Sequence, residues 1–267
     1  MADTAPSLTA WDAALAGTRS LRGYAQLALN AGLIRCAAAG HLRSRGGTDV
    51  VASIGSSLAV FAADGPGMTL EYVCGAPIFA NVLSVVCVPA GGTLTAEGPA
   101  DAWLVLTECG MLALGSVEDT GGCVRLRLAE QSRVVTEGHG RAGPRLLRKL
   151  VVDPLARAVA AVSWLDHIEV AVLGPGGSAG PRLDGGRQHI RAGGAICDAT
   201  FLAPSPSESH RILLVAAVMD GQRQSVGLHL YETWAHAADE DPVLVAKLPL
   251  PFDMATPVHL VPLPALP

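Results

Sequence analysis

The sequence has very little lysine, few aromatic residues and no long apolar run. Lys149 and Lys247 are its only lysines, and Phe, Trp and Tyr together make up 4% of its 267 residues. No apolar run reaches the roughly 18 residues needed to cross a membrane as a helix. The first ten residues lack a charged segment followed by an apolar block, so we expect no secretory signal. The alanine-rich stretch 11–39 is similar to a transit peptide, but Asp3 and Asp12 argue against organelle targeting.

A surplus of positive charge is also missing. The formal net charge is −5 and the isoelectric point is about 5.9, whereas a surface that neutralises phosphates is usually basic. We therefore expect no direct, non-specific contact with nucleic acid. The small basic cluster of Arg141, Arg145, Arg148 and Lys149 is interpreted as the solvated rim of a loop.

The six cysteines include no Cys-x-x-Cys pair. Several stand inside apolar runs, as in the stretch 83–88, which favours buried free thiols in a reducing compartment over a disulfide framework or a zinc site. They are Cys36, Cys74, Cys87, Cys109, Cys123 and Cys197.

The most regular feature that is present is an internal repeat. Half of the residues are apolar, and they gather in hairpin-like units of an apolar run, a short polar or glycine turn and a second apolar run. Four such units begin at Asp49, Ala102, Arg157 and Arg211, which are 53, 55 and 54 residues apart. The turns of these units are 55–57, 108–110, 165–167 and 220–224.

Two further apolar runs follow each hairpin, for example 68–73 and 81–88 after the first, so each unit holds four short strands. Four antiparallel strands repeated at such a period are typical of β-propeller blades. Runs such as 103–107 and 212–219 are nearly continuously apolar, which indicates strands buried on both faces. The alternative, a β-sandwich, would have about seven alternating strands without this period.

We therefore predict an all-β fold, a partial β-propeller of about four four-stranded blades that belong to a larger, seven-bladed ring. A flexible N-terminal segment, 1–20, is expected before the propeller part, 21–267. The expected blades are 33–80, 81–146, 147–194 and 195–256, and a further blade is expected to start at 257–267. The alternative is that the chain is a truncated gene product without a function of its own.

The same segments resemble one family of large nuclear proteins. Gly40–Phe61 resembles the opening of that family's first propeller, with Leu42 in place of its usual Phe. Segments 68–90 and 102–114 are similar to the next two parts. Lys149–Leu173 matches the family's Asp-Pro and Arg pattern at Asp153, Pro154, Arg157 and Asp166, and 199–232 resembles the segment after that. The family contains the damaged-DNA-binding, cleavage-and-polyadenylation and spliceosomal large subunits, and the chain is most similar to a plant-type member.

The resemblance implies a non-catalytic scaffold for protein–protein interaction in a nuclear multi-subunit complex. The complex would serve RNA processing, by splicing or 3′-end formation, or a cullin-type ubiquitin ligase in the DNA-damage response. The expected partners are protein subunits, with nucleic acid reached through them; the nucleus is the expected location, with the cytoplasm as the alternative. No small-molecule substrate, cofactor or membrane is expected.

An enzymatic alternative is a propeller hydrolase with carboxylates gathered near the central channel. Its candidate residues recur near strand ends or turns, where aspartate commonly caps backbone N–H groups instead, and we favour capping. They are Asp101, Asp153, Asp166, Asp198 and Asp220.

The remaining polar groups indicate no catalytic, cofactor or metal site. The eight histidines show no paired spacing on a helix, the glycine-rich stretch 174–186 lacks the lysine and helix of a phosphate loop, and His41 is expected to be packed and hydrogen-bonded at a strand end. The serines near 53–57 form no nucleophile elbow. The histidines are His41, His139, His167, His189, His210, His229, His236 and His259.

Overall fold

The computed structural model describes residues 34–43, 47–63, 69–90, 100–134, 149–162, 165–174, 181–183, 186–203, 211–220, 225–234, 242–253 and 260. These residues form sixteen strands and no helix. No helix among them could therefore cross a membrane.

The strands form four separate sheets of four antiparallel strands each, in simple up-and-down order. The first two sheets are β1 (Ile34–Gly40), β2 (Asp49–Ile54), β3 (Ser57–Ala62) and β4 (Glu71–Pro77), and β5 (Val82–Val88), β6 (Ala102–Thr107), β7 (Met111–Thr120) and β8 (Cys123–Arg133). The other two are β9 (Lys149–Val152), β10 (Ala158–Val162), β11 (His167–Val172) and β12 (Arg187–Arg191), and β13 (Ala195–Phe201), β14 (Arg211–Asp220), β15 (Ser225–Trp234) and β16 (Val243–Asp253).

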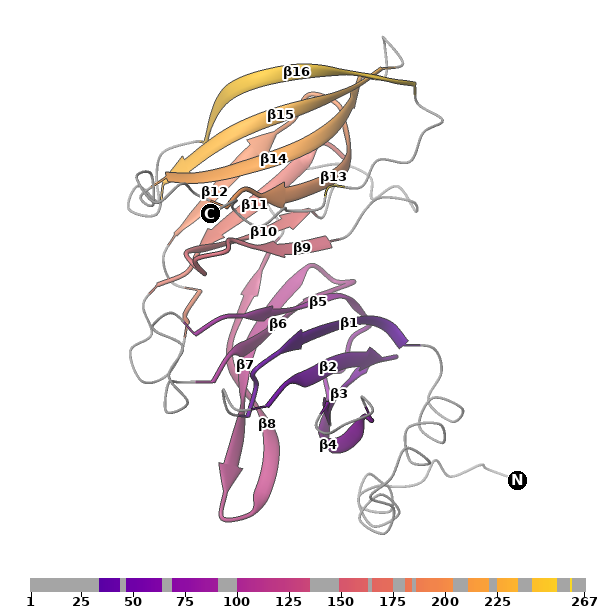
Figure 1. Ribbon diagram of the computed structural model, residues 1–267, viewed down its shortest axis with the longest axis vertical. Coiled ribbons are helices and arrows are strands. Elements are labelled where there is room, and N and C mark those ends of the chain that lie inside the picture. The colour runs from indigo at the N-terminus through magenta and orange to yellow at the C-terminus, as the bar shows by residue number, and fades with distance from the viewer. Residues whose placement is uncertain are drawn as a thin grey trace, which may run out of the picture.

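The four sheets lie one on another along the long axis of the molecule (Figure 1). Their first strands, β1, β5, β9 and β13, contact one another in sequence. Each sheet is therefore a propeller blade, here called blades 1 to 4, and the first strands form the hub. The described part of the chain does not close into a ring, so the predicted partial β-propeller is confirmed.

Most of the core lies in the layers between adjacent blades, and a smaller cluster lies within blade 1. One cluster joins blades 1 and 2 through Val60, Val85 and Trp103, another joins blades 2 and 3, and a third joins blades 3 and 4. The middle strands β6, β10 and β11 are buried along their whole length. This is why their sequences are continuously apolar rather than alternating.

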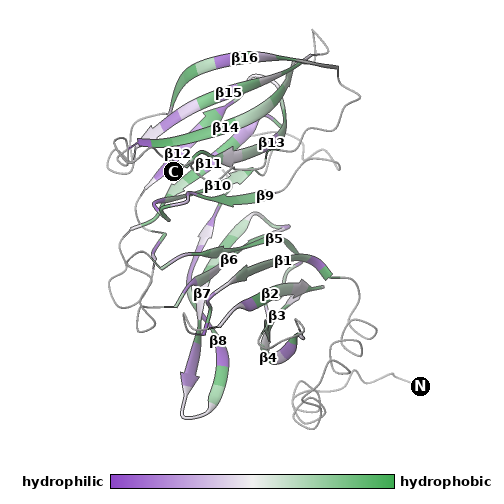
Figure 2. Cartoon of the chain, in the orientation of Figure 1, coloured by the Kyte–Doolittle hydropathy of each residue, from purple (hydrophilic) through white to green (hydrophobic). Residues whose placement is uncertain are grey.

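The outermost strands differ from that expectation. Burial alternates along β8, and most of β16 is exposed. In Figure 2 the far end of the β7–β8 hairpin accordingly mixes hydrophilic and hydrophobic residues, whereas the strands around the hub are mostly hydrophobic. Both-face burial thus holds for the inner strands of a blade and fails at its rim, where neighbouring blades diverge.

Several boundaries also differ from the sequence expectation. Ser57 and His167 lie in segments predicted as turns, but they begin strands β3 and β11. The polar segment 187–191 forms a complete strand, β12. In β12, Gln188 and Ile190 are buried while Arg187 and His189 are only partly so, which explains why its apolar signal is weak.

A glycine is required where Trp103 crosses blade 2. A Cβ atom at Gly115 would lie 2.1 Å from Cζ2 of Trp103 and 2.2 Å from the carbonyl oxygen of Arg127. The indole, which is 1% exposed, donates from Nε1 to the carbonyl oxygen of Ser116 at 3.1 Å. The largest side chain of the core therefore occupies the space that this glycine leaves.

Candidate functional site: the blade seams and the surface of blade 4

The seam between blades 1 and 2 is fastened beside the hub by Asp101. Its Oδ2 accepts the backbone N–H of His41 at 2.8 Å, and its Oδ1 accepts that of Ala90 at 3.1 Å. The backbone N–H of Asp101 in turn donates to the carbonyl oxygen of His41 at 2.8 Å. The ring Nδ1 of His41 lies 2.8 Å from the carbonyl oxygen of Gly47, so the predicted packed and hydrogen-bonded role of His41 is confirmed.

Asp153 holds the turn between β9 and β10. Its carboxylate accepts the backbone N–H groups of Leu155 and Arg157 and pairs with the guanidinium of Arg157 through two bonds of 2.8 Å. The Asp153 side chain is fully buried. This is the capping role that the sequence predicts for the Asp-Pro motif.

Asp198 differs from the expectation, because it lies inside β13 and not at a turn. Its Oδ1 accepts from Nζ of Lys149 and from the backbone N–H of Ala199, each at 2.8 Å. Contrary to its predicted place on a solvated loop rim, Lys149 is the first residue of β9 and pairs with this buried carboxylate. Asp166 is at the β10–β11 turn, and the side chain of Asp220, the last residue of β14, lies outside the described part.

The structure does not bring these carboxylates together. Asp101 precedes the second strand of blade 2, Asp153 that of blade 3, and Asp198 is in the first strand of blade 4, each with its own partners. Among the described residues, no three His, Cys, Asp or Glu side chains are grouped to hold a metal ion. The arrangement required for a hydrolase with converging carboxylates is thus absent from the described part.

Two histidines meet on blade 3, which spacing in the sequence does not indicate. The rings of His167 and His189 are stacked with centroids 5.3 Å apart, and Nε2 of His167 is 3.3 Å from Nδ1 of His189. On the same face, Glu169 pairs with Arg187 at 2.5 Å. Burial raises the pKa of Glu169, and the positive charge of Arg187 partly opposes this. Arg187 also donates to the carbonyl oxygen of Arg133 in blade 2, so the cluster fastens the seam between blades 2 and 3.

Blade 4 extends beyond blade 3, because β14, β15 and β16 have 10 or 11 residues and β9 to β12 only 4 to 6. A hollow of about 400 Å³ lies at this overhang. His229 lies in it beside Lys247, its cross-strand neighbour. Burial and the charge of Lys247 lower the pKa of His229. Nδ1 of His229 is 3.2 Å from the hydroxyl of Tyr231, whose pKa burial raises to about 12.

An apolar surface accompanies the hollow. Four aliphatic side chains of β16 are between 41% and 59% exposed. They are Val243, Leu244, Val245 and Leu248.

All six cysteines are free, and they divide by burial. Cys74 is buried, and Cys36, Cys87 and Cys197 are partly buried. Cys109, in the β6–β7 turn, and Cys123, the first residue of β8, are exposed. Burial raises the pKa of Cys87 to about 12 and that of Cys74 to about 11. The expectation of buried thiols is therefore wrong for Cys109 and Cys123.

Several residues considered in the sequence analysis lie outside the described part of the chain. They are His139, His210, His236, His259, Arg141, Arg145, Arg148 and most of 174–186. Sequence reasoning missed the polar residues of the hub, Cys36 and Ser84, and the ion pair of Asp49 with Arg43. Loops of unequal length separate the first strands from the hairpins, so the hub residues show no fixed spacing.

Comparison with models of protein families matches residues 33–266 to the RSE1/DDB1/CPSF1 first β-propeller. This span includes all four blades and agrees with the family expected from 40–61 and the segments after it. That family is a β-propeller domain of scaffold proteins that hold multi-subunit complexes together. Among curated proteins, none matches the chain.

Proposed function

Because the chain belongs to the family of RSE1/DDB1/CPSF1 first β-propellers, we propose that it is a non-catalytic scaffold for protein subunits of a nuclear complex. RNA processing, by splicing or 3′-end formation, is the preferred assignment, and a cullin-type ubiquitin ligase is the second. The match to this scaffold family over 33–266 is the observation that carries the proposal.

The construction of the blades supports a scaffold. Their seams combine continuous apolar layers with buried ion pairs and backbone hydrogen bonds, which makes them rigid. A rigid stack can present surface loops in fixed relative positions, and binding residues are commonly found on loops held in this way. The family supplies the function here, since the fold alone supports many.

Charge supports contact with nucleic acid only through partner proteins. Five cationic side chains of the described residues form ion pairs with buried or half-buried carboxylates. The chain as a whole is acidic. A phosphate backbone requires free cations to replace its counterions. The five pairs are Arg43–Asp49, Lys149–Asp198, Arg157–Asp153, Arg187–Glu169 and Arg211–Glu232.

The test is purification of the affinity-tagged chain from cells of its source, followed by quantitative mass spectrometry and by imaging of a fluorescent fusion. We expect nuclear fluorescence and enrichment of splicing or 3′-end-processing subunits. Enrichment of cullin-ligase subunits would select the second complex. The matched control is Gly115→Val, whose added side chain collides with Trp103 and should abolish the enrichment. Absence of both sets of subunits, with the blades folded, would overturn the proposal.

A further inference from the structure

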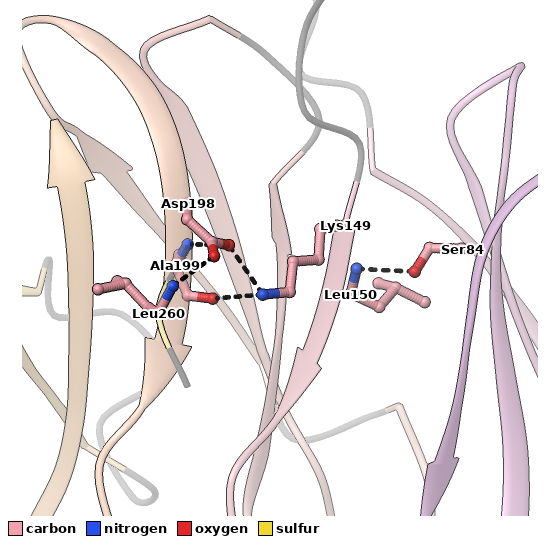
Figure 3. Close-up of polar contacts among 6 residues, drawn as sticks. All are labelled: Ser84, Lys149, Leu150, Asp198, Ala199 and Leu260. Atoms are coloured by element: carbon pink, nitrogen blue, oxygen red, sulfur yellow. Dashed lines mark hydrogen bonds and ion pairs between the residues drawn. The ribbon is translucent and has the colours of Figure 1, made fainter. Parts of the chain in front are cut away.

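The two lysines of the chain differ in whether a carboxylate neutralises them. Nζ of Lys149 is 2.8 Å from Oδ1 of the buried Asp198 (Figure 3). Lys247, in β16, is exposed and forms no ion pair with any described residue. An exposed lysine without a partner is common by itself, so the groups around Lys247 decide what it can bind.

His229 lies beside Lys247 and has one ring nitrogen uncovered. The two residues are opposite each other in the register of β15 with β16, and both line the hollow of blade 4. Nε2 of His229 has no hydrogen bond to a described residue. A Cβ atom at Gly227 would lie 3.9 Å from Nε2, so the absence of a side chain there leaves space beside this nitrogen.

Near neutral pH the two residues present one positive charge and one neutral ring. Burial and the charge of Lys247 lower the pKa of His229, so the ring is neutral. Burial raises the pKa of Tyr231 to about 12, so its hydroxyl keeps its proton and can donate to Nδ1 of His229. Nε2 then carries the ring proton and can donate it to an anion. One ammonium and one N–H donor suit a single carboxylate, whereas a polyanion requires many free cations.

β16 also provides a free sheet edge beside these residues. Among the described strands it pairs only with β15 and is the last strand of blade 4 (Figure 1). Four of its aliphatic side chains, all between Val243 and Leu248, are 41% to 59% exposed. Pro249 has no N–H that could extend the ladder, so 243–248 is the part of the edge that can pair with another strand.

The register predicts where the side chains of an added strand would lie. Directly opposite residues of paired strands have Cβ atoms about 5 Å apart on the same face of the sheet. The residue opposite Lys247 would therefore continue the row of His229 and Lys247 and lie at the hollow. Opposite charges stabilise such a pair and like charges destabilise it, so an acidic residue is favoured at this position.

We propose that the edge of β16 binds an extended segment of a partner protein, with an acidic side chain opposite Lys247 and an aliphatic residue on each side of it. The two aliphatic side chains lie on the other face of the sheet, next to Ala246 and Leu248, because side chains alternate along a strand. This inference deepens the scaffold function proposed above and rests on it, since it names the kind of segment that blade 4 holds.

A second copy of this chain suits the edge less well. Exposed strand edges can pair with each other, and a lysine on the edge opposes this. The segment Val243–Leu250 contains no aspartate or glutamate, so a second β16 would add another lysine and no carboxylate. Charge complementarity therefore favours an acidic partner segment over self-association.

The test is a titration of the 267-residue chain with capped heptapeptides, followed by NMR. One peptide alternates valine and glutamate, and the other alternates valine and glutamine. We expect the glutamate peptide to shift the amide signals of 243–248 and the ring signals of His229, and to slow hydrogen exchange in β16. The glutamine peptide should bind about two- to fivefold more weakly, because an exposed ion pair contributes this much.

Lys247→Glu tests the charge directly, and its exposed position makes unfolding an unimportant risk. In this variant a peptide that alternates valine and lysine should bind more tightly than the glutamate peptide, which reverses the order in the wild type. Arg125→Glu is the matched control, since it makes the same change of charge on the exposed β7–β8 hairpin. It should leave the wild-type order unchanged.

Three results would overturn the proposal. They are an absence of shifts in β16 with the glutamate peptide, equal binding of the glutamate and glutamine peptides, and concentration-dependent shifts of the same amides in the free chain, which would indicate pairing of two copies. The peptides require no subunit of the complex. Enrichment of subunits by the tagged chain without peptide binding would refute this inference alone, whereas peptide binding without enrichment would refute the scaffold function alone.

Discussion

Single side chains define where the blades touch. Trp103 fits because residue 115 has no side chain, and Asp101 joins two blades because both of its oxygens meet backbone N–H groups from different segments. Gly40 is similarly close to its neighbour across the same seam, where an added Cβ would lie 2.8 Å from Sγ of Cys87. Interiors packed as densely as this tolerate little added volume.

Gly115→Ala should therefore destabilise the protein. The new methyl group would overlap both the indole of Trp103 and the backbone at Arg127, and overpacking typically costs about 1–3 kcal/mol. Urea denaturation followed by tryptophan fluorescence measures the free energy of unfolding. Gly227→Ala is the control, since its Cβ would approach nothing closer than 3.4 Å. Equal midpoints for the two variants would contradict the packing argument.

The thiols should differ sharply in reactivity. The thiolate is the nucleophile, and burial raises the pKa of Cys74 to about 11 and of Cys87 to about 12. At pH 8 we expect iodoacetamide to label Cys109 and Cys123 first, because both are exposed, with Cys74 and Cys87 labelled only after denaturation. Peptide mass spectrometry gives the order. Early labelling of Cys87 in the folded chain would show that the first seam opens readily.

At the scale of elements, short polar turns and links set the geometry of each blade. The β9–β10 turn is organised by one buried carboxylate that binds two backbone N–H groups and a guanidinium. The β7–β8 hairpin carries a different kind of pair, in which Glu118 meets Arg125 and Arg127 on the exposed surface. Buried and exposed pairs of the same chemistry should differ greatly in what they contribute.

Asp153→Ala should accordingly be strongly destabilising. It leaves the half-buried Arg157 and two backbone donors without their acceptor, and breaking a buried pair in this way typically costs about 3–5 kcal/mol. Glu118→Ala is the matched control, and its unfolding midpoint should not change measurably. Thermal denaturation by circular dichroism compares them. A wild-type midpoint for Asp153→Ala would mean that the turn holds without its cap.

At the scale of the whole molecule, stability should follow the stacking of the blades. Among the described strands, the contacts between blades join neighbouring blades. The middle strand β10 of blade 3 is therefore covered on both faces, whereas the rim strand β16 is largely exposed. Local opening is easiest where buried apolar contacts are few. The exposed aliphatic residues of β16 mark the least covered part of blade 4.

Hydrogen exchange measured by mass spectrometry should show this gradient. We expect the slowest exchange in β6, β10 and β11 and clearly faster exchange in β8 and β16, since opening of the rim does not require the seams to separate. The comparison is made within one chain, so the inner strands are the control for the outer ones. Uniform protection across all sixteen strands would indicate that the rim is covered in solution.

The sequence alone determined the architecture, because strands buried between blades must be apolar throughout, and a period of 53 to 55 residues reports their repetition. The capping role of the Asp-Pro motif at 153–154 was likewise predictable, because aspartate commonly caps backbone N–H groups at turns. The contacts between distant strands, including those of the hub, were determined only by the tertiary structure. Asp198 meets Lys149 and Leu260 across 49 and 62 residues, and the His167–His189 stack joins two strands across 22. Such contacts depend on the register between strands and on how the blades stack. Because the connecting loops differ in length, the contacting residues have no regular spacing in the sequence.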